Sequence, residues 1–246
     1  MPSHGEPIEN PAQDIGMEQN RFPSRPWTQA AIDTFDLESA IPIARMAMEC
    51  GVDWLEVGSP LIYGEGFRAI GALKEIAGDH SLVVDFKARD NCYMLFREAR
   101  KHGADFATVT AAGNDFGVIE ALRARADCGI GVLADIYGLD IQDVPLRTKE
   151  LAAMGVDAIC IHFGNDQNAY DRVRQQYDGM REAKTAARGT AVSCSADTLL
   201  NAIAACKQGA DWVFFGADLL NSAETTKYGP LRHYVDTVHA FRRYSA

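Results

Sequence analysis

The sequence predicts an α/β fold of the (β/α)8, or TIM-barrel, type. Four Gly-x-Asp tripeptides recur along the chain at spacings of 52, 52 and 54 residues. They are Gly51–Asp53, Gly103–Asp105, Gly155–Asp157 and Gly209–Asp211. Each is preceded by a helical pattern and followed by a short apolar run typical of a buried strand. A period near 52 residues fits two βα units, so four periods predict the eight units of a barrel.

Eight strand-like runs alternate with the helical patterns. In chain order they are residues 27–32, 54–57, 81–84, 106–109, 129–133, 158–161, 189–192 and 212–215. Helices are expected between them, for example over 37–50 and 146–154, each followed by a glycine that suits a left-handed cap. A doubly wound sheet is the competing fold, but it normally has a glycine-rich phosphate loop after its first strand. Here the first strand ends in Ile32-Asp33-Thr34-Phe35 without a glycine, which favours the barrel.

Composition and charge exclude several classes of protein. The 246 residues are 47% hydrophobic and carry a formal net charge of -10, which argues against nucleic acid or an anionic membrane as a partner. No apolar run approaches the ~20 residues that a membrane span requires. The N-terminus also lacks the pattern of a secretory signal.

The cysteines and the N-terminal segment add two further expectations. Six cysteines without a C-x-x-C pair are expected to be reduced and mostly buried, as in a cytoplasmic protein, rather than to bind zinc. Residues 1–25 are rich in Pro, Gly, Asn, Gln and Glu and lack periodicity, so we expect a flexible N-terminal arm. Residues 26–246 are expected to form the barrel, which is the catalytic domain.

The segment from Asp85 to Asp90 is the most informative in the chain. It follows the apolar run 82–84 and places Asp85, Lys87 and Asp90 at the carboxyl end of the third strand, the edge where barrel enzymes carry their active sites. Because an unpaired charge is costly to bury, these groups are expected to compensate one another. The alternative is a surface salt-bridge cluster at the start of a helix, and D-x-K-x-x-D alone does not decide between the two.

Polar residues and one glycine also stand at the ends of the other expected strands. They are Asp33, Glu56, Asp135, His162, Asn165, Asp166, Ser195 and Gly216. Glu56 and Asp85 lie on neighbouring expected strands, so both carboxylates can reach one Mg2+, which prefers oxygen ligands. Lys87 is expected to stay protonated and to stabilise an oxyanion, and His162 titrates in a range that suits proton transfer. Each also has a structural alternative, such as a salt bridge inside the barrel or a hydrogen-bonded core histidine.

Four segments form a combination more specific than any one of them. They are Ala31-Ile32-Asp33, Glu56-Val57-Gly58-Ser59-Pro60-Leu61-Ile62, Asp85-x-Lys87-x-x-Asp90 and His162-Phe163-Gly164-Asn165-Asp166-Gln167. In order and approximate spacing, from about residue 27 to 216, the chain resembles the orotidine-monophosphate-decarboxylase superfamily. The resemblance is to the branch of 3-hexulose-6-phosphate synthases and 3-keto-L-gulonate-6-phosphate decarboxylases.

The resemblance implies a (β/α)8 homodimer whose active sites lie at the subunit interface. It implies that Glu56 and Asp85 help to bind Mg2+, and that Lys87 stabilises a cis-enediolate. Asp90 would reach into the neighbouring subunit's site, and His162 would be positioned for proton transfer. Asp33 is assigned to the same catalytic group, and the expected substrate-binding residues are Asp135, Asn165, Asp166, Ser195 and Gly216. Enzymes of this branch form the enediolate by losing carbon dioxide or by retro-aldol cleavage, and then protonate it or add it to an aldehyde such as formaldehyde.

The ends of the seventh and eighth expected strands depart from the family pattern. The family binds its substrate phosphate with a Gly-Gly turn after strand 7 and a Gly-Arg pair after strand 8. The corresponding residues here are Ser193-Cys194-Ser195-Ala196 and Gly216-Ala217. The arginine is missing and Asp218 follows, whose carboxylate opposes a phosphate. We therefore expect either a substrate other than the usual phosphorylated sugar, or a phosphate bound by another basic residue such as Lys227 or Arg89.

The preferred function is that of a Mg2+-dependent carbon–carbon lyase, an aldolase like 3-hexulose-6-phosphate synthase, that acts on a ketose or keto-acid sugar derivative. Residues 59–62 and Asp135 are closer to the synthase than to the decarboxylase. The alternatives are a 3-keto-gulonate-6-phosphate-type decarboxylase, a sugar epimerase or isomerase, and a non-catalytic family member that only binds a ligand. Release of an aldehyde or carbon dioxide separates the lyases from the epimerase, and a lack of both turnover and Mg2+ binding favours the non-catalytic protein.

Overall fold

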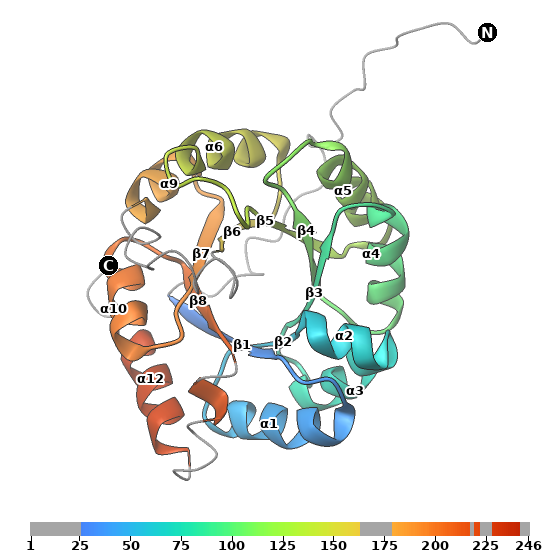
Figure 1. Cartoon of the computed structure of the whole chain (residues 1–246), viewed down its shortest axis with the longest axis vertical. Coiled ribbons are helices and arrows are strands. Elements are labelled where there is room, and N and C mark those ends of the chain that lie inside the picture. The colour runs from blue at the N-terminus through green and yellow to red at the C-terminus, as the bar shows by residue number, and fades with distance from the viewer. Residues whose placement is uncertain (1–25, 163–178, 217–218, 222–227, 242–246) are drawn as a thin grey trace, which may run out of the picture.

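The computed structural model describes residues 26–162, 179–216, 219–221 and 228–241. Eight parallel strands in chain order form a closed barrel, as Figure 1 shows in a view along the barrel. The strands are β1 (Trp27–Ile32), β2 (Trp54–Val57), β3 (Leu82–Ala88), β4 (Phe106–Thr110), β5 (Gly131–Asp135), β6 (Ala158–Ile161), β7 (Ala191–Ser195) and β8 (Trp212–Phe215). The predicted (β/α)8 fold is therefore confirmed. Residues 1–25, expected to be a flexible arm, lie outside the described residues.

Helices surround the barrel on its outside (Figure 1). They are α1 (Leu37–Glu49), α2 (Ser59–Glu65), α3 (Arg68–Ala77), α4 (Cys92–Lys101), α5 (Phe116–Cys128), α6 (Val144–Met154), α9 (Met180–Ala186), α10 (Leu199–Lys207) and α12 (Gly229–Ala240). Helix α1 begins where the Asp36 carboxylate accepts the backbone N–H of Ser39 at 2.7 Å, as an N-cap residue does. Apolar residues between the strands and these helices form the larger part of the core.

Four strands extend further than the apolar runs indicate, and for β4 the difference is the single residue Thr110. The expected end of the third strand at residue 84 is wrong, because β3 continues to Ala88. The charged residues stay in this strand because β4 supplies polar partners for them, although the pairing with β4 is irregular between Val84 and Ala88. Strands β5 and β7 begin and end later than expected, so Asp135 and Ser195 are the last residues of strands rather than parts of the following loops.

Large aromatic residues fill the N-terminal half of the barrel interior. The indole rings of Trp27 and Trp212 stack with centroids 5.0 Å apart, and Trp54 stacks on Phe106 at 4.9 Å. Gly131 leaves room for this cluster, since a Cβ at that position would lie 2.0 Å from the ring of Phe106. Within the described part of the chain, this packing fills the N-terminal end of the barrel and leaves the C-terminal ends of the strands as the side for a ligand.

The four Gly-x-Asp tripeptides hold the N-terminal end of the barrel together. Their glycines have the φ angles of left-handed caps, 86°, 98°, 85° and 98° in chain order, as predicted. Each aspartate accepts a backbone N–H from the preceding odd-numbered strand: Thr28 to Asp53 (2.9 Å), Leu82 to Asp105 (3.0 Å), Val132 to Asp157 (2.8 Å) and Val192 to Asp211 (2.7 Å). Each also pairs with a basic side chain of an outer helix: His239, Lys74, Arg125 and Lys184 in the same order. The repeat therefore stabilises the N-terminal end of the barrel, opposite the C-terminal ends of the strands.

All six cysteines have free thiols, and four of them are buried. The sequence-based expectation of unpaired, mostly buried cysteines is thus confirmed. Among the described residues, no helix combines the length and the apolar character that a membrane span needs.

Candidate active site

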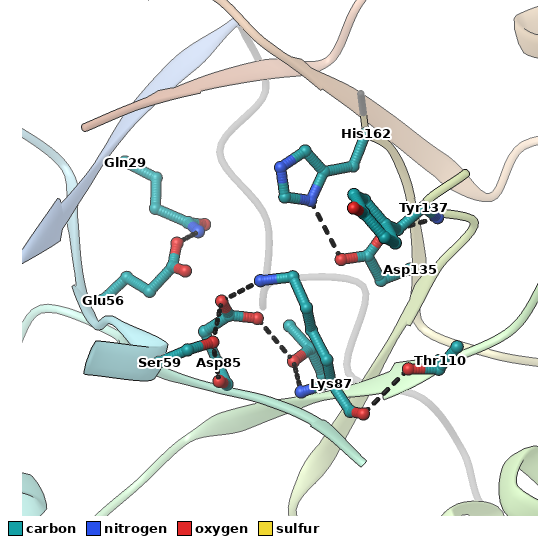
Figure 2. A network of polar contacts seen from close by, with 10 residues as sticks. Gln29, Glu56, Ser59, Asp85, Lys87, Thr110, Asp135, Tyr137 and His162 are labelled. Atoms are coloured by element: carbon teal, nitrogen blue, oxygen red, sulfur yellow. Dashed lines mark hydrogen bonds and ion pairs between the residues drawn. The ribbon is translucent and has the colours of Figure 1, made fainter. Parts of the chain in front are cut away.

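Strand geometry brings the polar residues together at the C-terminal mouth of the barrel. Side chains on a strand alternate between its two faces, so every second residue above the aromatic cluster points inward. The inward polar residues that form contacts at the mouth are Gln29, Glu56, Asp85, Lys87, Thr108, Asp135 and His162. Figure 2 shows the labelled members of this set, which come from β1, β2, β3, β5 and the end of β6, converging on the barrel axis: Gln29, Glu56, Asp85, Lys87, Asp135 and His162.

Asp85 is the centre of the network on β3. Its Oδ2 binds the ammonium group of Lys87 and also accepts the hydroxyl of Ser59 at 2.8 Å. Its Oδ1 accepts the hydroxyl of Thr108, on β4, at 2.9 Å. Three donors from three different elements therefore fix the orientation of one buried carboxylate (Figure 2).

The backbone of Lys87 is fixed as firmly as its side chain. Its φ is 44°, in the left-handed region that residues with a Cβ rarely adopt. Two threonines of β4 hold this conformation: the Lys87 N–H donates to Thr108 Oγ1 and the Thr110 hydroxyl donates to the Lys87 carbonyl, both at 2.8 Å. A strained residue that neighbouring groups hold in place is typical of functional sites.

The two charges on β3 stabilise each other. Burial alone would lower the pKa of Lys87, but the carboxylates of Asp85 and Asp135 raise it above its usual range. Burial would likewise raise the pKa of Asp85, but the charge and the hydrogen bond of Lys87 hold it below its ordinary value. At neutral pH the mouth thus contains an ammonium and a carboxylate, both charged.

Glu56 lies on the neighbouring strand β2, and its pKa is shifted in the direction opposite to that of Asp85. It is buried, and Gln29 donates a hydrogen bond from Nε2 to Glu56 Oε2. Burial, together with the nearby charge of Asp85, raises the pKa of Glu56 well above its ordinary value. The two carboxylates therefore repel each other, and a cation near both would remove that repulsion.

The donor chemistry of this pair fits Mg2+. Both groups present hard carboxylate oxygens on adjacent strands, as Mg2+ prefers, and the ion usually keeps several water ligands. Within the described part of the chain, no three His, Cys, Asp or Glu side chains group as a metal site. Glu56 and Asp85 would therefore hold the ion as a pair of carboxylates completed by water and by substrate oxygens.

His162 faces this network from the end of β6. Its Nδ1 lies 3.1 Å from Asp135 Oδ2, while Asp135 Oδ1 accepts the backbone N–H of Tyr137 at 2.8 Å. The rings of Tyr137 and Phe214 contact the imidazole edge-on, with centroids 5.5 and 5.3 Å away. Burial would lower the pKa of His162, but the Asp135 carboxylate outweighs burial and raises it. The result is an oriented imidazole that carries a proton more readily than a free histidine does.

Asp33 follows β1 directly, and its carboxylate lies next to two glycines, Gly58 and Gly216. A Cβ on Gly58 would lie 2.1 Å from Asp33 Oδ1, and a Cβ on Gly216 would lie 3.1 Å from Asp33 Oδ2. The carboxylate is open to solvent on one side, but partial burial in the concave mouth, together with the charge of Asp85, raises its pKa. The two glycines thus make room for the Asp33 side chain over the mouth.

The structure does not bring all the expected site residues together. Asp90 is exposed and its described contact is with Asn91, so it does not join the Asp85–Lys87 pair as the compensating-charge interpretation expected. The reason is local: β3 ends at Ala88 and Asn91, with φ 54°, turns the chain into α4. Ser195 is buried at the end of β7 and Gly216 follows β8 at the mouth. Asn165 and Asp166 lie outside the described residues.

A model of the family described as "Orotidine 5'-phosphate decarboxylase / HUMPS family" matches residues 27–179. The chain belongs to this family. The resemblance inferred from the four sequence segments is thereby confirmed. The structure adds that the matched range contains β1 to β6 with the whole Asp85, Lys87 and His162 network.

The relatives of this family member include synthases and decarboxylases. It is 29% identical to the 3-hexulose-6-phosphate synthase of Bacillus subtilis (strain 168) over 201 residues, which are 80% of this chain and 91% of the relative. It is 34% identical to that of Mycobacterium gastri over 141 residues, 57% of this chain and 67% of the relative. A solved 3-hexulose-6-phosphate synthase superimposes with a TM-score of 0.75 at 27% identity, over 85% of this chain and 99% of the other. The 3-keto-L-gulonate-6-phosphate decarboxylase of Vibrio cholerae shares the fold at a TM-score of 0.70 and 24% identity, over 87% and 99% of the two chains.

Several residues of the site were not predicted from the sequence. They are Gln29, Ser59, Thr108, Thr110, Tyr137 and Asp197. Gln29 and Thr108 carry a usable signal, because each is polar at an inward position of an otherwise apolar strand. Ser59 lies in the segment 56–62 that carries the family resemblance, but its contact with the distant carboxylate of Asp85 has no local signal. Asp197 carries no signal, since its partner is the backbone N–H of Gly216.

Proposed function

We propose that the protein is a Mg2+-dependent carbon–carbon lyase of the aldolase type, which acts on a sugar-derived substrate through a cis-enediolate. The observation that supports this best is the arrangement of an ammonium group and an oriented imidazole at one mouth. The ammonium of Lys87 and the imidazole of His162 come from opposite sides of the barrel, and each is held by its own carboxylate. A fixed positive charge and a proton-transfer group are what formation of an enediolate requires.

Lys87 stabilises the negative charge that develops on the substrate. Transfer of a proton from the carbon beside the ketose carbonyl to the unprotonated Nε2 of His162 leaves an enediolate, whose charge lies mainly on oxygen. The Lys87 ammonium is already oriented by Asp85, so it needs no reorganisation when that charge forms. Carbon 1 of the enediolate then attacks the carbonyl carbon of an aldehyde, a carbon–carbon bond forms, and the aldehyde oxygen takes up a proton. The cleavage direction reverses these steps.

His162 transfers the proton in this account. Its Nδ1–H is donated to Asp135, which leaves Nε2 for the substrate. The raised pKa of His162 favours the protonated ring, which delivers a proton to the alkoxide or the enediolate. Asp135, which we expected to contact substrate, acts here as the residue that positions the imidazole.

Mg2+ bound by Glu56 and Asp85 would polarise the substrate oxygens and lower the energy of the enediolate. Glu56 and Asp85 would hold the ion close to Lys87, whose ammonium binds Asp85. Asp33 adds a hydrogen-bond acceptor for a substrate hydroxyl at the edge of β1. The remaining proposed substrate contacts are made by Ser195, Gly216, Asn165 and Asp166.

The aldolase reaction is preferred over the decarboxylase reaction. The relatives with 27–34% identity that cover much of this chain are named 3-hexulose-6-phosphate synthases. The decarboxylase of Vibrio cholerae, at 24% identity, supports the shared fold alone. The substrate class that the names of these relatives indicate is a sugar phosphate.

We also propose a homodimer in the cytoplasm. Tyr63 of α2, Met94 of α4 and Phe116 of α5 are large exposed hydrophobic side chains on helices that lie on the same side of the barrel in Figure 1. Asp90 is exposed at the start of the α4 segment, so it is available to a neighbouring subunit's site. A second copy that covers this side would bury the apolar side chains. The six free thiols suit a reducing compartment.

Exchange of substrate hydrogen with solvent tests the proposed chemistry. The protein is incubated with a ketopentose and Mg2+ in deuterium oxide, and NMR follows the signal of the carbon 1 protons. An enediolate predicts stereospecific loss of one proton signal that depends on protein and Mg2+. Exchange without aldehyde consumption or carbon dioxide release would favour the isomerase alternative, and no exchange with any ketose would contradict the proposal.

A further inference from the structure

Among the described residues, the rim at the ends of β1, β7 and β8 carries the carboxylates of Asp33 and Asp197 and no basic side chain. Asp197 follows β7, and its Oδ1 accepts the backbone N–H of Gly216 at 2.9 Å. This N–H belongs to the residue directly after β8, which lies beside Asp33. It already has an acceptor within the protein, so an anionic substrate group has to displace a carboxylate in order to bind it.

A second carboxylate stands on the same rim. A Cβ added to Gly216 would lie 3.1 Å from Asp33 Oδ2 and 4.0 Å from Asp197 Oδ1, so the two acids flank one position. Each of the two adds negative charge where an anion bound at Gly216 would sit. The groups whose positive charge acts on Asp33 are Lys87 of β3 and His162, which follows β6.

A third acceptor lies deeper, on β1. Gln29 is 3% exposed and donates from Nε2 to Glu56, whereas its Oε1 accepts no hydrogen bond from the described residues. Figure 2 shows the Gln29 amide directed toward the barrel axis, beside Glu56. An acceptor that is buried without a donor costs free energy, so a hydroxyl or amide group of a ligand would stabilise this oxygen by donating to it.

We propose that the substrate presents a hydroxyl group, and no phosphate, to the rim formed by Asp33, Asp197 and Gly216. This inference rests on the proposed function, because it assumes that the enediolate end of the substrate faces Lys87 and His162. A hydroxyl donates a hydrogen bond to a carboxylate, whereas a phosphate dianion meets two like charges. The reacting oxygens of the substrate would thus face Lys87 and His162, and the hydroxyls of an unphosphorylated ketose or keto acid would face the acceptors of this rim.

The first test compares D-ribulose with D-ribulose 5-phosphate as the sugar that condenses with formaldehyde in the presence of Mg2+. For the wild type we expect kcat/KM to be at least tenfold higher with D-ribulose. Asp197→Asn keeps an acceptor for the Gly216 N–H but removes one charge, so the preference is expected to fall about tenfold. Glu75→Gln removes the same charge from an exposed position on α3 and is expected to leave the ratio unchanged.

The second test measures binding without turnover. Calorimetry with D-ribulose, D-ribulose 5-phosphate and inorganic phosphate gives the preference of the rim directly. Tighter binding or faster turnover of the phosphate ester by the wild type, or an unchanged ratio in Asp197→Asn, would overturn this inference and leave the lyase proposal intact. Tighter binding of D-ribulose without turnover of either sugar would support the inference and overturn the lyase proposal.

Discussion

Lys87 and Asp85 lie two residues apart on β3, and the Lys87 ammonium binds the Asp85 carboxylate inside the barrel mouth. Both side chains point inward because residues at i and i+2 of a strand share a face. The two β4 threonines and Ser59 hold the pair in place, so the ammonium stays charged at a fixed position. The proposed catalysis depends on this fixed charge.

Removal of the ammonium should abolish most activity. For Lys87→Ala we expect a decrease in kcat of at least about 10²-fold, the usual effect of losing one oxyanion-stabilising group. Steady-state kinetics measure the effect, and circular dichroism checks that the barrel persists. Turnover within a few-fold of the wild type would contradict the assigned role of Lys87.

The double variant Lys87→Ala/Asp85→Asn separates stability from catalysis. The single variant leaves Asp85 buried without its cation, so its melting temperature should fall. Neutralising Asp85 as well should recover part of that loss, because no unpaired charge remains. Activity should stay absent in the double variant, and recovery of turnover would contradict the proposal.

Asp135→Asn should shift the pH dependence of the reaction. The Asp135 carboxylate raises the pKa of His162 against the effect of burial, so its neutralisation should lower that pKa. The limb of the pH–rate profile that belongs to His162 then moves to lower pH. Tyr137→Phe is the matched control, since the Tyr137 contact to Asp135 is made by its backbone N–H and is kept. An unmoved limb in Asp135→Asn would exclude His162 as the titrating group.

Metal affinity can be tested without turnover. Glu56→Gln and Asp85→Asn each remove one anionic oxygen from the proposed Mg2+ pair, and each should weaken Mg2+ binding at least tenfold. Titration calorimetry with MgCl2 alone measures the affinity, with Glu75→Gln as the control for net charge. If both variants bind Mg2+ as the wild type does, the ion is not held by these carboxylates.

Substitutions at the N-terminal end of the barrel, away from the active site, should lower stability and leave activity unchanged. Asp157 accepts the Val132 N–H and pairs with Arg125, so Asp157→Ala leaves a buried donor unpaired. We expect a loss of about 1–3 kcal/mol in the free energy of unfolding, measured in urea, with kcat near that of the wild type. Asp79→Ala, at an exposed position, should change neither quantity. A large loss of kcat in Asp157→Ala at a temperature where it is folded would contradict the separation of the two ends.

The fold was predictable because the repeated signals are local. Each Gly-x-Asp tripeptide combines a helix cap with the acid that binds the neighbouring strand, and the bounds of β1, β2, β6 and β8 follow directly from the apolar runs beside them. Strand β3 was predicted too short because charged residues normally end a buried strand. The polar partners that keep Lys87 in the strand are on β4, and no local pattern reveals them.

The candidate site was predictable in part. Inward residues of the strands, such as Glu56 and Asp135, could be identified because the alternation of a strand fixes where they point. Asp90 could not be separated from Asp85 and Lys87, because the turn at Asn91 that directs it away depends on backbone conformation. Asp197 gave no signal, since its partner is a backbone N–H on another strand.

Formaldehyde consumption is the measurement that tests the central claim most directly. The wild type and Lys87→Ala are each incubated with formaldehyde, Mg2+ and either D-ribulose or D-ribulose 5-phosphate, and the aldehyde and the ketose product are quantified. The account predicts Mg2+-dependent loss of formaldehyde, matched by a six-carbon ketose, with the wild type and almost none with Lys87→Ala. Equal consumption by both proteins, or none with either sugar from a folded wild type that binds Mg2+, would contradict it.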